Sequence, residues 1–137
     1  MMGTLGPTIL LVEDSVDDAF IMKRALQKGG IENPLQIVTD GQQALDYLTG
    51  KGSYADRESY PLPCIMFLDL KLPYVHGFEV LDRIRQRTDL NSLVVVVLTG
   101  SSEKKDCNRA YALGARSYLV KPPTAQLLRD IFNSLSS

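Results

Sequence analysis

The amino-acid sequence predicts an α/β fold in which a parallel sheet is covered by helices on both faces. Short apolar runs alternate five times with segments of helical periodicity. Because parallel strands must be joined by crossovers, this repeated strand–helix order favours a parallel sheet. The run Cys64–Leu68 is apolar throughout, which is typical of a strand covered on both faces. A chain of 137 residues is expected to form one domain.

The first predicted strand is the apolar run Thr8–Val12, and a helix follows it. Ser15 is a suitable N-cap for this helix, and Asp17 and Asp18 lie in its first turn, where the helix dipole favours negative charge. Gly29 ends the helix. Four apolar residues repeat at helical spacing and are expected to face the sheet: Ile21, Met22, Ala25 and Leu26.

The next unit is shorter and is followed by a polar segment. Pro34–Val38 predicts the second strand, and the helix after it stops at Gly50. The segment Lys51–Pro61 is polar and rich in turn residues, so we expect an extended loop. Tyr54 and Tyr60 are the two aromatic side chains that could hold this loop against the surface.

The second half of the chain continues the alternation after the Cys64–Leu68 strand. The apolar residues of 78–84 predict a helix, and Leu93–Leu98 is the run with the strongest β propensity. A polar helix is expected over Glu103–Leu113, followed by a short strand at Ser117–Val120. The last helix carries its apolar stripe over Leu127–Phe132.

Composition excludes several classes of protein. A net charge of −1 and the lack of a basic stripe argue against nucleic-acid binding. No apolar run approaches the roughly 20 residues that span a bilayer, and no signal peptide is visible. Cys64 and Cys107 form no metal or disulfide pattern, which favours free thiols in a reducing, cytoplasmic setting. We expect a loose leader at residues 1–7 and one domain over residues 8–137.

Polar side chains with reactive chemistry follow four of the five predicted strands. Glu13 and Asp14 follow the first strand, Asp69 the third, Thr99 the fourth and Lys121 the fifth. Since parallel strands share a direction, these side chains are expected at one edge of the sheet, where α/β proteins bind ligands. Three converging carboxylates repel one another, and a hard divalent cation such as Mg²⁺ relieves that repulsion.

This set of residues is suited to phosphoryl transfer onto a carboxylate. Asp69 is the natural nucleophile, because it stands alone at the end of the central strand. Glu13 and Asp14 are the natural metal ligands, with Asp69 as a third. Lys121 offers a positive charge to a phosphoryl oxygen, and Thr99 offers a hydroxyl.

Four motifs resemble the receiver domain of two-component response regulators. They are Leu10–Ser15, Leu68–Pro73 with Gly77, Val97–Gly100, and Gly114–Pro122. Their order and spacing extend the resemblance over nearly the whole chain. The long polar loop and the lack of an output domain resemble the small stand-alone regulators that pair with phytochrome-type sensor kinases.

The resemblance implies a flavodoxin-like (βα)5 fold, a doubly wound parallel sheet with strand order 2-1-3-4-5. It implies that Asp69 accepts a phosphoryl group from the phosphohistidine of a sensor histidine kinase or a phosphotransfer protein. Glu13, Asp14, Asp69 and the backbone carbonyl of Lys71 would surround Mg²⁺. Lys121 would contact a phosphoryl oxygen. A cis Lys121–Pro122 peptide bond is also expected.

The resemblance further implies a switch. Thr99 would move toward the phosphoryl group and Tyr118 would follow it inward. Lys71 and Ser101 lie where family members control dephosphorylation. The output surface would be the fourth helix, fifth strand and fifth helix, through which receivers of this type often form homodimers.

Three alternatives remain open on the sequence alone. An aspartyl phosphatase would need a second aspartate where Lys71 stands, so we do not expect an enzyme. A flavodoxin-like cofactor binder would need a phosphate-cradling loop in place of Glu13 and Asp14. A receiver that acts only as a scaffold would not need the complete acidic set.

Overall fold

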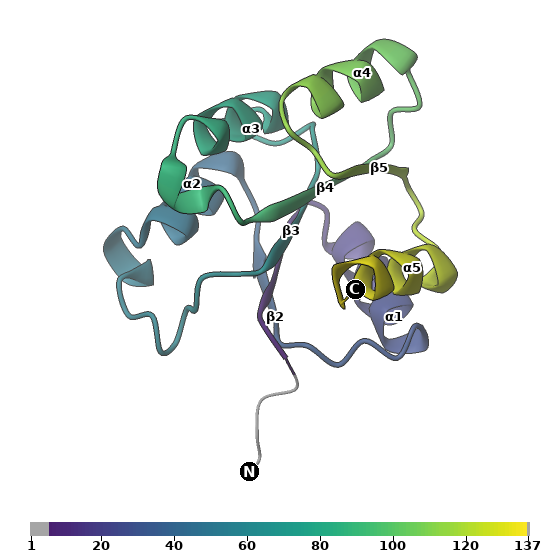
Figure 1. Ribbon diagram of the computed structural model, residues 1–137, viewed down its shortest axis with the longest axis horizontal. Helices are drawn as coiled ribbons and strands as arrows, with labels where there is room; N and C mark the ends of the chain where they lie inside the picture. Colours follow the sequence, from purple (N-terminus) through teal and green to yellow (C-terminus); the bar gives the residue numbers. More distant parts are fainter. Residues whose placement is uncertain (1–5, 137) are drawn as a thin grey trace.

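A computed structural model describes residues 6–136 and shows the predicted α/β architecture (Figure 1). All four strand pairs are parallel, and the strand order is β2-β1-β3-β4-β5. The strands are β1 (Ile9–Val12), β2 (Leu35–Val38), β3 (Ile65–Leu68), β4 (Val94–Thr99) and β5 (Ser117–Val120). The helices are α1 (Val16–Lys28), α2 (Gly41–Thr49), α3 (Gly77–Arg85), α4 (Lys104–Ala112) and α5 (Ala125–Ser136).

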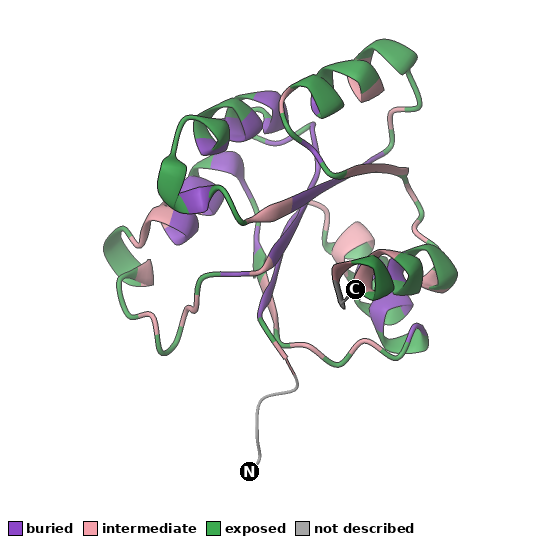
Figure 2. Cartoon of the chain, in the orientation of Figure 1, coloured by how far each residue is buried: buried purple, intermediate pink, exposed green. Residues whose placement is uncertain are grey.

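Helices cover both faces of the sheet, as the sequence predicts. Figure 1 shows α1 and α5 on one face and α2, α3 and α4 on the other. Each face has its own apolar core, one packed against α1 and α5 and the other against α2, α3 and α4. The central strands β1 and β3 are buried along their whole length, since both of their faces are covered (Figure 2).

The register of the sheet brings the strand ends to one level. Val12 at the end of β1 lies beside Leu68 at the end of β3, and Leu68 lies beside Val97 of β4. Thr99 lies beside Val120 at the end of β5. Consequently the polar residues that follow these strands emerge along a single edge of the sheet.

Helix α1 begins as expected, but one of its predicted core residues is exposed. The Ser15 side chain accepts a hydrogen bond from the Asp18 N–H, so Ser15 is the N-cap. Met22 and Leu26 are buried, whereas Ile21 is 44% exposed. The prediction that Ile21 faces the sheet was therefore wrong, because Met22 occupies the centre of the inward stripe.

The segment before β3 is more ordered than an extended loop. It contains a short 3-10 helix at Gly52–Tyr54. Arg57 donates hydrogen bonds to the carbonyl oxygens of Tyr47, Leu48 and Tyr60. The expected role of the loop aromatics is confirmed, because Tyr54 and Tyr60 pack against the core and against the fully buried Tyr47.

Three further expectations concern the N-terminal leader, membrane-spanning helices and the peptide bond between Lys121 and Pro122. Of the predicted leader at residues 1–7, residues 1–5 lie outside the described residues. Within residues 6–136, no helix has the length and apolar character needed to cross a bilayer. The expected cis peptide bond between Lys121 and Pro122 is present.

Candidate functional site

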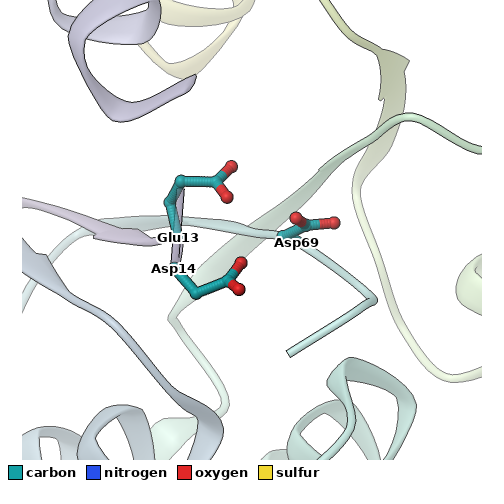
Figure 3. Close-up of side chains that lie close together, drawn as sticks. All are labelled: Glu13, Asp14 and Asp69. Atoms are coloured by element: carbon teal, nitrogen blue, oxygen red, sulfur yellow. The ribbon is translucent and has the colours of Figure 1, made fainter. Parts of the chain in front are cut away.

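Three carboxylates meet where β1 and β3 end. Glu13, Asp14 and Asp69 each offer an oxygen, and these oxygens lie within 4.8 Å of one another. Figure 3 shows the three side chains close together, with the Glu13 and Asp14 carboxylates on the side of Asp69. Glu13 and Asp69 are nearly buried, at 3% and 7% exposure, while Asp14 is exposed. This arrangement keeps two charges close in a desolvated place and leaves one side of the cluster open to solvent.

The Lys121 ammonium group binds this cluster from the end of β5. Its Nζ lies 2.5 Å from Glu13 Oε1, 2.8 Å from Asp18 Oδ2 and 3.0 Å from Asp69 Oδ2. Such charge-assisted hydrogen bonds are short and strong. The ammonium group therefore neutralises part of the negative charge that the carboxylates bring together.

Burial and these ion pairs shift the pKa values of the cluster. Burial by itself lowers the pKa of Lys121, but the hydrogen bonds to Asp18, Glu13 and Asp69 outweigh it and raise that pKa above its usual value. Burial raises the pKa of Glu13, and the hydrogen bond from Lys121 opposes that rise. Lys121 is consequently held as a cation, as a group that contacts anionic oxygens must be.

Thr99 presents an unused hydroxyl beside the cluster. It is the last residue of β4, next to β3 in the sheet, and it is fully buried. Among the described residues, its Oγ1 is the one buried side-chain oxygen or nitrogen without a hydrogen-bond partner. Leaving such a group unpaired is costly, so this hydroxyl is available to an incoming oxygen ligand.

The turn after β3 fixes the backbone around Asp69. The Lys71 N–H lies 3.4 Å from Asp69 Oδ1, and the Lys71 side chain is exposed. The Gly77 N–H donates to the Leu70 carbonyl oxygen at 2.9 Å, which brings the start of α3 against the turn. A Cβ at Gly77 would lie only 2.5 Å from the Asp69 carbonyl oxygen, so this close approach requires glycine.

Tyr118 lies beside the loop between β4 and α4. Its hydroxyl donates to the Ser101 carbonyl oxygen at 2.8 Å, and its ring packs partly buried against the core. Burial raises the pKa of this phenol. The proposed output face also carries exposed apolar side chains on α4, β5 and α5, namely Tyr111, Val120 and Leu127.

The structure adds two residues that the sequence interpretation missed. Asp18 was interpreted only as a favourable charge in the first turn of α1, yet it binds Lys121. Its partner lies 103 positions away in the chain, so no local sequence pattern indicated this contact. His76 is exposed, and its Nδ1 accepts a hydrogen bond from the Phe78 N–H and caps α3.

The arrangement combines a nucleophile, a cation site and two groups that can stabilise oxyanions. Asp69 is a carboxylate at the end of the central strand, and the acidic trio offers the oxygen ligands that Mg²⁺ prefers. Lys121 and Thr99 offer a positive charge and a hydroxyl from neighbouring strands. These are the groups that transfer of a phosphoryl group onto a carboxylate requires.

Comparison with known proteins gives matches over most of the chain. Residues 9–133 match the response regulator receiver domain. Response regulator Rcp1 of Synechocystis sp. is 40% identical over 124 residues, which cover 90% of this chain and 80% of Rcp1. The crystal structure of the Mn²⁺-bound form of Rcp1 has a TM-score of 0.77 at 36% identity and covers 96% of this chain and 93% of that one.

Two further solved structures share the fold. The bacteriophytochrome response regulator RtBRR has a TM-score of 0.84 at 40% identity, over 96% of this chain and 78% of that one. The phosphorylated cyanobacterial phytochrome response regulator RcpA has a TM-score of 0.78 at 32% identity, over 95% of this chain and 91% of that one. Since the family match extends over nearly the whole chain and these relatives share its strand arrangement, this chain belongs to the response regulator receiver domains of two-component systems.

Proposed function

We propose that the chain is a phosphorelay switch whose phosphoacceptor is Asp69. The observation that carries this proposal is the position of Asp69, nearly buried between two other carboxylates and the Lys121 ammonium group. The family supports it, and the relative RcpA has been crystallised in a phosphorylated form. Residues 8–137 would form the functional unit.

We further propose that Glu13, Asp14 and Asp69, with the Lys71 carbonyl oxygen, hold Mg²⁺. The donor set is all oxygen and its carboxylate oxygens lie within 4.8 Å of one another, which fits a hard divalent cation. Rcp1 has been crystallised with Mn²⁺, a cation of the same ligand preference. When bound, the cation would neutralise charge on the phosphoryl oxygens.

In the proposed reaction, an Asp69 carboxylate oxygen forms a bond to the phosphorus atom of a phosphohistidine. The phosphorus–nitrogen bond breaks, and the imidazole leaves with that electron pair and takes a proton from solvent. Lys121 and Thr99 would donate hydrogen bonds to the phosphoryl oxygens, and their charge and hydroxyl stabilise the negative charge that the acceptor site receives. Thr99 and Tyr118 would then report the new charge to α4, β5 and α5.

Replacing Asp69 by asparagine is expected to abolish phosphorylation, because an amide oxygen is a far weaker nucleophile than a carboxylate. The measurement is intact mass after incubation with acetyl phosphate, with and without Mg²⁺. Wild type should gain one phosphoryl mass only with Mg²⁺, and Asp69→Asn should gain none. A folded wild type that gains no mass would favour the scaffold alternative.

We propose that the chain is not an enzyme that turns over a free phosphoester. The pattern typical of aspartyl phosphatases is Asp-x-Asp, and the second aspartate position is Lys71 here. The chain therefore lacks, at this position, the second carboxyl group that serves as the general acid in those enzymes. The phosphoryl group would therefore stay on Asp69 until water removes it.

The donor partner is proposed to be a cytoplasmic sensor histidine kinase or a phosphotransfer protein. Val16, Phe20 and Ile21 of α1 are exposed apolar side chains, and Ile21 lines a cavity of about 300 Å³ with Lys121. Such a patch beside the site is suited to a protein partner. RtBRR and RcpA are named as phytochrome regulators, which supports a phytochrome-type kinase.

Homodimerisation is proposed through the face formed by α4, β5 and α5. Tyr111, Val120 and Leu127 are 48%, 44% and 45% exposed, so each of these elements presents an apolar side chain. If phosphorylation reshapes this face, the mass in solution should rise toward twice that of the monomer after acetyl phosphate treatment. Sedimentation equilibrium measures this mass. Val120→Asp should keep the phosphorylated protein monomeric, because the dimer would have to bury an unpaired carboxylate.

A further inference from the structure

The loop between β4 and α4 is tied to α4 through one residue, Ser101. The Ser101 hydroxyl donates to Asp106 Oδ2 at 2.7 Å and accepts from the Glu103 N–H at 3.3 Å. Its carbonyl oxygen accepts from the Tyr118 hydroxyl at 2.8 Å. Ser101 therefore joins the loop, the start of α4 and the middle of β5.

Ser101 and Asp106 differ from the other polar residues at the start of α4. Both are half-buried, whereas the four residues from Ser102 to Lys105 are exposed. A hydrogen bond to a carboxylate is stronger than one between neutral groups, especially where water is partly excluded. The contact between Ser101 and Asp106 is thus a charge-assisted link between the loop and α4 that is partly shielded from water.

The position of Ser101 connects this link to the phosphoacceptor. Ser101 is two residues after Thr99, whose buried hydroxyl lacks a partner among residues 6–136. If Thr99 moved toward a phosphoryl group, it would displace the backbone of Ser101. Because Asp106 holds the Ser101 side chain, that displacement would reach the first turn of α4.

We infer that Asp106 is a positioning residue that makes the β4–α4 loop and the start of α4 move as one body. This inference rests on the proposed function, since it needs a phosphoryl group on Asp69 to displace Thr99. Among the described residues, Asp106 makes no hydrogen bond or ion pair with Glu13, Asp14 or Asp69. Its role is to transmit the displacement of the loop to α4, and it takes no part in phosphoryl transfer.

The test compares Asp106→Ala with wild type by ¹H–¹⁵N NMR before and after acetyl phosphate and Mg²⁺. In wild type, phosphorylation should change the amide chemical shifts of Leu70 and Gly77 near Asp69. It should also change those of Cys107 and Ala110 in α4. In Asp106→Ala, the shifts near Asp69 should stay as in wild type, while the shifts in α4 should fall at least about twofold, since the coupling between the two places is weakened.

Two variants control this experiment. Asp106→Asn keeps an oxygen that accepts from the Ser101 hydroxyl, so the α4 shifts should return toward wild type. Glu103→Ala removes a neighbouring carboxylate whose ion pair with Lys105 is exposed at the surface, and it leaves the backbone N–H that binds Ser101. It should behave as wild type. Intact mass shows that each protein carries one phosphoryl group.

The outcomes separate the inference from the proposed function. Wild type that gains no phosphoryl mass would overturn both. Phosphorylated wild type without shifts in α4 would overturn the inference alone. Full α4 shifts in phosphorylated Asp106→Ala would also overturn it, because the loop and helix would then be coupled without this contact.

Discussion

Replacing Lys121 by methionine is expected to slow phosphorylation by acetyl phosphate by about 100-fold, the effect of removing one group that stabilises an oxyanion. Lys121 lies within 3.0 Å of Asp69 Oδ2, so its ammonium group reaches the place where the phosphoryl oxygens would lie. Methionine has a similar length and no charge. The rate is measured by the growth of the phosphorylated species in intact mass spectra at saturating Mg²⁺.

The same variant should change stability and metal affinity in opposite directions. Without Lys121, Glu13 and Asp69 remain buried and close together, which costs about 3 kcal/mol of unfolding free energy in the absence of metal. Mg²⁺ should bind more tightly to Lys121→Met than to wild type, because the competing ammonium charge is gone. Urea unfolding and calorimetric titration with Mg²⁺ measure these two changes.

Lys105→Met is the matched control for this variant. Lys105 pairs with Glu103 at the surface, and its side chain is 80% exposed, so its loss should leave all three properties unchanged. If Lys121→Met kept the phosphorylation rate of wild type, Lys121 would not contact the phosphoryl group. Unchanged Mg²⁺ affinity would show that the ammonium group does not compete with the cation.

Replacing Gly77 by alanine is expected to destabilise the fold by about 2 kcal/mol, a typical cost of inserting a group into a packed place. The new Cβ would lie 2.5 Å from the Asp69 carbonyl oxygen and 2.6 Å from Leu70 Cα. These are backbone atoms, so α3 and the turn after β3 must separate. Because that turn positions Asp69, phosphorylation by acetyl phosphate should also slow.

Gly100→Ala serves as the control for backbone effects. A Cβ at Gly100 meets no heavy atom within 4 Å, and its φ does not require glycine. Its stability should therefore match wild type or rise slightly, since alanine restricts the unfolded chain. Urea unfolding compares the two variants, and equal stability of Gly77→Ala and wild type would contradict the proposed contact.

The fold could be predicted from the sequence because the three inner strands, β1, β3 and β4, carry nearly continuous apolar runs. Cys64–Leu68 and Leu93–Leu98 become the buried strands β3 and β4, and the residues after them reach the same edge as expected. The exposure of Ile21 could not be predicted from spacing alone. It depends on how far α1 is rotated against the sheet, which tertiary packing decides.

Parts of the candidate site also depend on contacts between distant residues. Asp18 and Lys121 are separated by 103 positions, so their ion pair follows from the placement of α1 beside the end of β5. The link between Ser101 and Asp106 is local, but polar residues at a helix start are usually solvated caps. Their partial burial, which periodicity does not reveal, distinguishes this pair.

Locating the phosphoryl group on the chain tests most directly whether Asp69 is the phosphoacceptor. Borohydride reduces an acyl phosphate to an alcohol, so an aspartyl phosphate at position 69 becomes homoserine, and peptide mass spectrometry identifies the altered residue. After treatment with acetyl phosphate and Mg²⁺, we expect homoserine at position 69 and intact carboxylates at Glu13 and Asp14. Reduction at another carboxylate, or at none in a protein that has gained a phosphoryl mass, would contradict this expectation.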